Sequence, residues 1–436
     1  MGLQAASEGV SQAPRKDLQR LQSLIDSRIN GGVMADLDEF RAEFRVEVGS
    51  WLDANCPSSL LGKSFSPADG VWGGRKWAWT EPDRKLWLER MAEKGWTAPA
   101  WPTEYGGGGL DPAQVKVLSQ EMAKRRAPPP LIGFGLTMIG PTLLRFGNEE
   151  QKREHLGRIC RGEIRWCQGY SEPGAGSDLA SLQTKAEDDG DHFVVSGTKV
   201  WTSYADEADW IFALVRSDPK AKKQEGITFL LIDMDTPGVS VSPIKLISGS
   251  SPFCETHFEN VRVPKSNVVH EINAGWTVAK ALLGHERTMI ADAFGAGVRG
   301  GRRRSLADRA RKYLPEAESG VLPDPVLRDR ITQVELDTRA FMLTVQRTRD
   351  AAKAGHQPGA ESSLFKVYGT ELNQRRQELL VSMAGPQSLG WEGEGFDEEE
   401  LALARDWLRS RGNTIEGGTS EIQRNIIAKR VLGLPD

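Results

Sequence analysis

Residues 210–215 and 227–232 read Trp-Ile-Phe-Ala-Leu-Val and Ile-Thr-Phe-Leu-Leu-Ile, two short runs of apolar and β-branched side chains. Runs of this length and composition are typical of buried strands. A similar run covers residues 192–195, just after residues 188–191 (Asp-Asp-Gly-Asp), which have the composition of a hairpin turn. No helical pattern separates these runs between residues 163 and 269. The spacing therefore predicts an antiparallel sheet or small barrel, not a dinucleotide-binding α/β unit.

Helical patterns lie on both sides of these strands. Upstream, Phe44, Val48 and Leu52 share a helical spacing, and residues 83–94 form a second helical run. Residues 99–109 must form a loop, because four consecutive glycines disfavour a helix.

Downstream, the helical period returns after Gly275, and residues 328–354 and 361–383 are long enough for bundle helices. The sequence predicts an α+β protein of several domains, in chain order a mobile N-terminal tail (1–35), an N-terminal helical domain (36–161), a middle β domain (162–272) and a C-terminal helical bundle (273–436).

Composition excludes several classes of protein. The 436 residues include 56 Lys and Arg against 60 Asp and Glu, so a globally basic nucleic-acid binder is excluded. No apolar run approaches the roughly 18 uncharged residues of a membrane helix. The four cysteines form no Cys-x-x-Cys, which argues against a disulfide framework or a cysteine-rich zinc site. Without a signal-peptide pattern, we expect a cytoplasmic protein with no membrane partner.

Residues 168–178 (Gln-Gly-Tyr-Ser-Glu-Pro-Gly-Ala-Gly-Ser-Asp) are the first segment with chemical potential. Its proline and glycines force a turn, and the exposed backbone N–H groups of such a turn can hold a phosphate or a flavin edge. An ordinary tight turn between strands is the alternative. The segment is not a G-x-G-x-x-G dinucleotide fingerprint.

Glu286 belongs to the second such segment, a predicted helix over residues 275–294. The helix carries one apolar stripe, made of Ala279, Leu282, Leu283, Met289, Ile290 and Ala293. Glu286 lies on this stripe, where a carboxylate is costly to bury unless it is paired or functional. Burial would raise its pKa toward the range of a general base. Neutralisation by Arg287 or another cation is the structural alternative.

The third segment covers residues 415–425 (Ile-Glu-Gly-Gly-Thr-Ser-Glu-Ile-Gln-Arg-Asn). Ser420 and Gln423 have capping-box spacing, which predicts a helix that begins there and runs to Gly433. A helix N-terminus after a glycine turn suits an anionic or carbonyl-bearing ligand. An ordinary capped terminal helix would have the same pattern.

Five motifs in this order resemble the acyl-CoA dehydrogenase family over about residues 38–433. They are Trp-Pro-x-x-Tyr-Gly-Gly at 101–107, Ser-Glu-Pro-Gly-Ala-Gly-Ser-Asp at 171–178, Gly-Thr-Lys-Val-Trp-Thr-Ser at 197–203, Phe-Glu-Asn-Val-Arg-Val-Pro at 258–264 and Gly-Gly-Thr-Ser-Glu-Ile-Gln-Arg-Asn at 417–425. The resemblance implies N-terminal helices, a middle antiparallel β-barrel and a C-terminal four-helix bundle, with FAD bound non-covalently.

The implied reaction is α,β-dehydrogenation of an acyl-CoA thioester, as used in lipid catabolism. A carboxylate takes the α-proton, hydride passes to flavin N5, and an electron-transfer flavoprotein accepts the electrons. A homodimer or homotetramer is expected, with a hetero-oligomer possible. Two alternatives stay open: a non-catalytic, FAD-holding subunit of a hetero-oligomer, and a flavin oxidase or monooxygenase on the same fold.

The resemblance also implies which residues meet the cofactor. Tyr170 would contact the flavin through its backbone and Ser171 through its hydroxyl, while Trp201 would rest against the flavin edge. The full implied set is Gln168, Gly169, Tyr170, Ser171, Gly176, Ser177, Trp201, Thr202, Ser203, Thr419, Ser420 and Glu421.

Two glutamates are candidates for the base. The family places it either in Tyr-Glu-Gly-Thr near the C-terminus or just before an arginine on the first bundle helix. Ungapped matching puts Gly417 at the first position and leaves Glu416 one residue early. Glu286, followed by Arg287, matches the second position. We therefore predict Glu286 as the base, with Glu416 as the alternative, and a substrate site that includes Ser177, Arg287 and Gly417.

The sequence departs from the family pattern in two places. Arg-x-x-Phe-Gly, which reaches a neighbouring subunit's FAD, is missing, and residues 299–311 are instead rich in arginine. The Gln-x-x-Gly-Gly-x-Gly segment is only partly present, at residues 383–390. The arginines are either a substitute contact for the adenine end of FAD or a solvated charged face.

Overall fold

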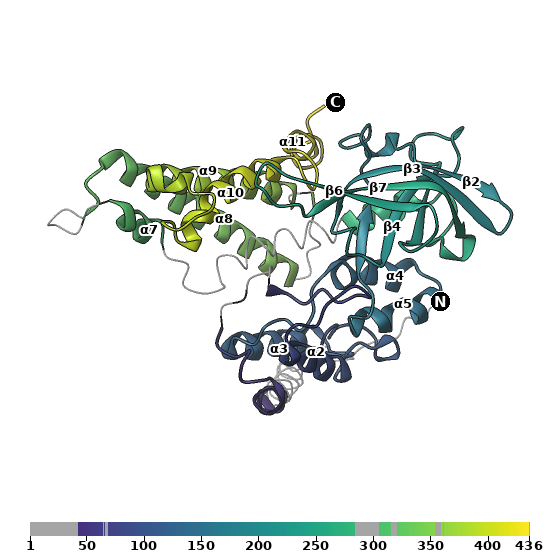
Figure 1. Ribbon diagram of the computed structural model, residues 1–436, viewed down its shortest axis with the longest axis horizontal. Helices are drawn as coiled ribbons and strands as arrows, with labels where there is room; N and C mark the ends of the chain where they lie inside the picture. The colour runs from purple at the N-terminus through teal and green to yellow at the C-terminus, as the bar shows by residue number, and fades with distance from the viewer. Residues whose placement is uncertain are drawn as a thin grey trace, which may run out of the picture. The chain divides into compact units, whose positions relative to one another are not determined.

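The computed structural model describes residues 42–63, 65, 69–283, 305–314, 321–353, 359–360 and 362–435 (Figure 1). The predicted N-terminal tail lies outside these residues. The chain divides into two compact units: one holds residues up to Gly70 together with Glu81–Pro130, and the other holds Val71–Thr80 together with the chain from Leu131 onward.

The first unit is helical. Its elements are a helix over residues 42–55, α2 (Pro82–Glu93), a 3₁₀ turn (Thr103–Tyr105) and α3 (Pro112–Arg125). Phe44, Val48 and Leu52 are buried in its core, as their spacing predicts. Residues 99–109 form the expected loop around the 3₁₀ turn. Gly107 is required there, because a Cβ atom would lie 2.2 Å from the Trp101 carbonyl oxygen.

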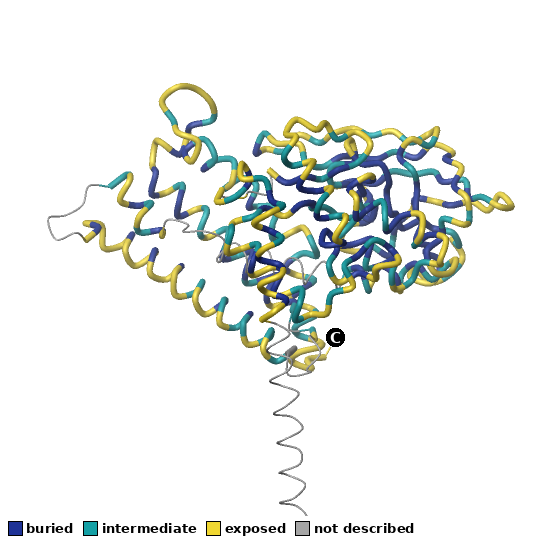
Figure 2. The backbone as a smooth tube through the Cα atoms, turned by 90° about the horizontal axis from the view of Figure 1, so that it is seen from below, coloured by how far each residue is buried: buried dark blue, intermediate teal, exposed yellow. Residues whose placement is uncertain are grey.

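The second unit contains a curled seven-stranded sheet. Two helices, α4 (Gly140–Phe146) and α5 (Glu149–Cys160), precede it. The strands are β1 (Trp166–Gly169), β2 (Lys185–Asp189), β3 (His192–Ser203), β4 (Trp210–Arg216), β5 (Ile227–Asp233), β6 (Val239–Ile244) and β7 (Phe253–Pro264). Strands β4 and β5, predicted from the two apolar runs, are buried almost throughout, and Figure 2 shows buried residues gathered along the strands.

The prediction of an antiparallel sheet is wrong for β1. It holds for β2, which pairs antiparallel with β3 along residues 185–189 through the predicted hairpin at 188–191 and adds one parallel bridge to β4. Both strands pair in parallel with β4, β1 at residues 210–213 and β2 at Arg216, whereas β5 pairs antiparallel along residues 210–216. β1 and β2 are therefore successive segments along one edge of β4. Residues 170–184, the excursion between β1 and β2, leave the edge of β4 and return to it further along. No hairpin lies between β1 and β2, so both strands run in the same direction. β5 and β6 are the outer strands of the described sheet, so it is a curled sheet and not a closed ring.

A carboxylate anchors residues 71–80 to this sheet. The Asp209 side chain is completely buried and accepts hydrogen bonds from the backbone N–H groups of Arg75 (3.0 Å) and Arg165 (2.7 Å). The Arg75 guanidinium adds a bond to Asp209 at 3.2 Å and also reaches Asp233 and Asp235 at 2.7 and 3.0 Å. Asp209 thus satisfies buried donors from two separate segments of the chain.

Helix α5 packs an imidazole against the sheet. The His155 ring stands edge-on to Trp166 and Trp210, with ring centroids 5.2 and 4.8 Å away, and it is buried. Burial lowers its pKa from 6.5 to about 4, so the folded protein holds it neutral at physiological pH.

We expect His155 to make the protein less stable in acid. The unfolded chain takes up a proton at this residue as pH falls through 6.5, but the folded protein does so only near pH 4. Stability should therefore fall between pH 6.5 and 4, by about 3 kcal/mol from this residue. Urea unfolding of wild type and His155→Phe at pH 7.5 and 4.5 tests this. An equal acid loss in both proteins would contradict it.

The remainder of the second unit is a helical bundle. After a helix that begins at residue 275, its elements are α7 (Leu306–Tyr313), α8 (Pro325–Lys353), α9 (Ser362–Ala384), α10 (Glu398–Ser410) and α11 (Ser420–Ile426). Helices α8 and α9 match the two long helices predicted from the sequence. Among the described residues, no helix combines the length and apolar character needed to cross a bilayer.

The helix from residue 275 starts directly on the sheet. A Cβ atom at Gly275 would lie 2.5 Å from the backbone nitrogen of Phe229, so only glycine permits this approach. Ala279 and Leu282 are fully buried, which confirms the start of the predicted apolar stripe. Its continuation, including Glu286 and Arg287, lies outside the described residues.

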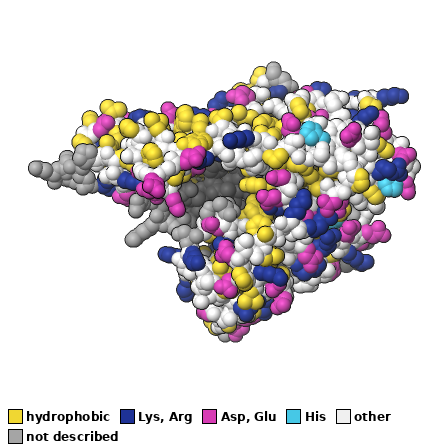
Figure 3. Space-filling view, viewed as in Figure 1, with side chains coloured by type: hydrophobic (Ala, Val, Ile, Leu, Met, Phe, Trp, Pro, Cys, Tyr) yellow, Lys and Arg dark blue, Asp and Glu magenta, His cyan; other side chains and the backbone are white. Residues whose placement is uncertain are grey.

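All four cysteines are free and buried. Acidic and basic side chains are intermixed on the face seen in Figure 3, in keeping with the small net charge of -4.

Candidate functional site

The excursion between β1 and β2 begins with a tight turn. Glu172 and Ala175 exchange two backbone hydrogen bonds of 3.1 and 3.0 Å. Gly169 and Tyr170 are buried just before the turn, whereas Gly176 and Ser177 are exposed after it. Gly176 has open space where a Cβ atom would lie. The predicted flavin and CoA residues thus divide into an inner end at 168–171 and an outer end at 176–177.

A buried ion pair lies beneath this turn. The Glu172 carboxylate accepts hydrogen bonds from the Gln183 and Thr184 backbone N–H groups, at 2.6 and 2.8 Å, and from the Lys199 ammonium at 2.8 Å. The same ammonium donates to the Tyr170 carbonyl oxygen at 3.2 Å.

Trp201 lies on a bulge in β3 opposite β7. The register shifts between Lys199 and Thr202, and Trp201 has a φ of +61°, a strained value for a bulky residue. Trp201 is 54% exposed. Strain and exposure together are typical of a residue that serves a ligand.

Thr202 and Ser203, which follow Trp201, differ in whether their hydroxyl groups can bind a ligand. The Thr202 hydroxyl is buried and bonds the Cys254 carbonyl oxygen at 2.7 Å and the Thr256 hydroxyl at 2.8 Å. Thr202 can therefore offer a ligand only its backbone. Ser203 is half-buried, and its side chain makes no hydrogen bond within the described part of the chain.

A line of contacts joins Trp201 to the third predicted segment. The Trp201 and Phe253 rings stand edge-to-face with centroids 6.0 Å apart, and the Arg409 guanidinium lies 5.5 Å from the Phe253 centroid. Arg409 in turn bonds Glu416 at 2.7 Å. The fold thus links the Trp201 bulge to the segment that contains Glu416 and Thr419, although more than 200 residues separate them.

The predicted capping box is wrong by one residue. Thr419 caps α11 by accepting a bond from the Ile422 N–H at 3.2 Å, and Ser420 is the first helical residue. The Gln423 amide instead donates to the Gly417 carbonyl oxygen at 3.2 Å, because Gly417 and Gly418 take positive φ values that fold the chain back. The α-helix also ends at Ile426 and continues as a π-helical turn over Ile427–Val431, short of Gly433.

The three predicted ligand residues of this segment differ in how far they are exposed. Ser420 is buried, Thr419 is half-buried and Glu421 is exposed. Glu416 is exposed as well, with its carboxylate engaged by Arg409 and by the Asn413 amide at 2.6 Å. An exposed carboxylate lacks the desolvation that a base for a weakly acidic α-proton needs.

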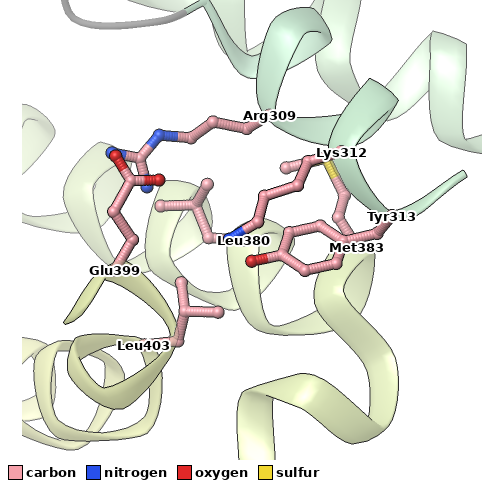
Figure 4. A pocket seen from close by; sticks show the side chains of 7 residues that line it. All are labelled: Arg309, Lys312, Tyr313, Leu380, Met383, Glu399 and Leu403. Carbon is pink, nitrogen blue, oxygen red and sulfur yellow. The ribbon is translucent and has the colours of Figure 1, made fainter. Parts of the chain in front are cut away.

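The described arginines of the 299–311 region pair with acids of the bundle. Arg309 lies 3.9 Å from Glu399, and Arg311 bonds Asp308 at 2.9 Å. Arg309 lines a small pocket between α7, α9 and α10, drawn in Figure 4, with room for about one water molecule. Arg311 is exposed and matches the solvated-face interpretation, whereas Arg309 is half-buried. Residues 299–304 lie outside the described part of the chain.

Sequence reasoning missed the supporting residues Glu172, Lys199, Phe253 and Arg409. Only Lys199 carries a signal in the sequence. It lies an even number of residues after the buried Phe193 and Val195 on β3, which predicts an inward side chain, and a buried lysine needs an acid as its partner.

Models of known protein families match most of the chain. The N-terminal, middle and C-terminal domains of acyl-CoA dehydrogenase match residues 74–163, 167–261 and 273–432.

Individual relatives match over nearly their full length. "Acyl-CoA dehydrogenase IpdE1" of Mycobacterium tuberculosis is 37% identical over 403 residues, 92% of this chain and 99% of the relative. The solved "Tcur3481-Tcur3483 steroid ACAD" is 33% identical with a TM-score of 0.69, covering 92% of this chain and 98% of that one. The ChsE4-ChsE5 complex of Mycobacterium tuberculosis is 30% identical with a TM-score of 0.67, over 91% and 98%. The chain belongs to the acyl-CoA dehydrogenase family and is an oxidoreductase of that class.

Proposed function

We propose that this enzyme binds FAD non-covalently and uses it for the α,β-dehydrogenation of an acyl-CoA thioester. The observation that carries the proposal is the exposed, strained Trp201 beside the turn after β1. The Val200 N–H donates to the Ser171 carbonyl oxygen at 2.9 Å, so the Trp201 bulge and the turn form one continuous edge.

The residues along this edge fit a flavin ring. Gln168, Ser171 and Ser203 are half-buried, and no hydrogen bond within the described residues uses their side chains. Three uncommitted polar groups beside an exposed indole suit a planar, heteroatom-rich ligand. Gln168, Ser171 and Ser203 would hydrogen-bond the ring, and Trp201 would cover its edge.

In the proposed reaction, Glu286 removes the α-proton of the thioester. That proton is weakly acidic, so the base must be desolvated and close to it. Ala279 and Leu282, which begin the predicted stripe, are fully buried, and the place of Glu286 on that stripe is a prediction from the sequence. When bound, FAD would accept the hydride that leaves the β-carbon. Ser177, Arg287 and Gly417 would bind the substrate.

We also propose a class of acyl group for the substrate. One similar structure is named a steroid acyl-CoA dehydrogenase, which supports a bulky ring-bearing acyl chain as the substrate class. Two similar structures are named as assemblies of two proteins, which supports a hetero-oligomer beside a homodimer or homotetramer. We further propose an electron-transfer flavoprotein as the electron acceptor and the cytoplasm as the location.

Anaerobic mixing of the purified protein with acyl-CoA thioesters tests the function. The panel should pair straight-chain with steroid-type thioesters, and bleaching of the flavin absorbance should follow at least one of them. Yellow protein that no thioester bleaches would favour a non-catalytic, FAD-holding subunit. Oxygen consumption during turnover would favour an oxidase or monooxygenase. Colourless protein that added FAD does not restore would contradict the proposal.

Ser171→Ala should weaken FAD binding or slow flavin reduction without unfolding the protein. The substitution removes one hydroxyl that no described residue uses, so the folded state loses no hydrogen bond of its own. FAD titration of the apoprotein and anaerobic reduction measure the effect. Ser240→Ala on β6, an exposed serine, is the matched control. Unchanged FAD affinity and reduction rate in Ser171→Ala would remove Ser171 from the site.

A further inference from the structure

The Lys199 ammonium is completely buried, which is unusual for a lysine. Burial lowers the pKa of Lys199 to about 8, against the opposing effect of the Glu172 charge. Burial also opposes ionisation of Glu172, but the Lys199 charge and the donated hydrogen bonds hold its pKa below the usual value. The pair is therefore charged at neutral pH. Buried pairs contribute little stability relative to well-packed apolar residues, so their geometry is the more informative property.

Lys199 fixes the direction of the peptide between Tyr170 and Ser171. The Tyr170 carbonyl oxygen faces the ammonium at 3.2 Å. In a planar trans peptide the N–H points opposite to the C=O, so the Ser171 N–H is directed away from Lys199. The next carbonyl, that of Ser171, is held by the Val200 N–H at 2.9 Å. Adjacent β3 residues thus restrain two consecutive peptides of the turn.

The same ammonium lies between the two parts of the proposed flavin site, residues 168–171 and the Trp201 bulge. Lys199 lies two residues before Trp201, where the register of β3 begins to shift. Lys199 also binds the Glu172 carboxylate, which accepts hydrogen bonds from the N–H groups of Gln183 and Thr184 at the end of the excursion. Removing the ammonium would take away the Lys199 bonds to the Tyr170 carbonyl and to Glu172, and would leave the Val200–Ser171 hydrogen bond between residues 168–171 and the strand that carries Trp201.

We propose that Lys199, paired with Glu172, is a positioning residue that holds residues 168–171, just before the turn, and the Trp201 bulge in the arrangement that receives the flavin. The inference rests on the proposed FAD function. It assigns Lys199 no contact with the cofactor and no part in proton or hydride transfer.

Four variants test the proposal. Lys199→Met removes the charge with little change in length, and Lys199→Arg retains it. The double variant Glu172→Gln/Lys199→Met leaves no unpaired buried charge, so it is the one to score if Lys199→Met fails to fold. Lys265→Met is the control, because Lys265 makes a 2.7 Å ion pair with Asp188 at the hairpin of the same sheet. For each apoprotein, the readouts are the Kd for FAD, the visible spectrum of the bound flavin, and amide hydrogen exchange over residues 168–171.

The folded Lys199→Met or double variant should bind FAD at least about tenfold more weakly than wild type. Residues 168–171 should exchange faster, and any bound flavin should show a shifted spectrum. Lys199→Arg should recover most of the affinity, and Lys265→Met should match wild type. Wild-type Kd, spectrum and exchange in the folded variant would overturn the positioning role alone. A wild-type apoprotein that does not bind FAD would overturn the proposed function as well, so the two failures are distinct.

Discussion

Glu286→Gln should retain FAD and bind acyl-CoA but lose flavin reduction by several orders of magnitude. The amide keeps the size and polarity of the side chain but cannot accept the α-proton, so the loss should fall on the chemical step. Stopped-flow absorbance after anaerobic mixing measures that step directly. A separate titration of the oxidised enzyme with acyl-CoA shows whether binding survives.

Glu416→Gln is the matched control for this experiment. Glu416 is exposed and already engaged by Arg409 and Asn413, so its loss should leave most of the reduction rate intact. If Glu416→Gln abolishes reduction while Glu286→Gln remains active, the base is Glu416, and the ungapped matching that put Gly417 at the base position is displaced by one residue.

Asp209→Ala should lower the free energy of unfolding by about 1–3 kcal/mol for each backbone N–H that loses its acceptor in the interior. The carboxylate satisfies the N–H groups of Arg75 and Arg165 in the interior. Alanine would leave both donors without an acceptor and the Arg75 guanidinium with one fewer anion. Urea unfolding followed by tryptophan fluorescence measures the loss. Because Trp72 and Trp77 belong to the anchored segment, their local environment should change as well.

Asp235→Ala provides the comparison for Asp209→Ala. Asp235 pairs with the same Arg75 at 3.0 Å, but its side chain is 61% exposed, so water can replace the lost contact. Its effect on unfolding should be small. Equal losses in the two variants would mean that the Arg75 charge, and not the buried acceptor at Asp209, holds this segment.

The sequence by itself determined the elements whose burial follows a local period. Phe44, Val48 and Leu52 repeat at helical spacing and share one buried face. The runs at 210–215 and 227–232 are strands because their apolar, β-branched side chains suit a position covered on both faces. Motifs in order along the chain were sufficient to identify the family. The assignment of Glu286, Ser171 and the other site residues remains a prediction from those motifs.

Tertiary structure alone decided the partners and directions of these elements. β1 and β2 run parallel to β4 because residues 170–184 leave and rejoin one strand edge, a path with no signal in strand composition. Thr419 caps α11 in place of Ser420 because Gly417 and Gly418 fold the chain back there. The Asp209 bonds to Arg75 span 134 residues, and Lys199 meets Glu172 across 27. A side chain's local period predicts that it is buried. Which distant group satisfies its charge depends on how the strands pack, because a buried polar atom must find its partner in space and not along the chain.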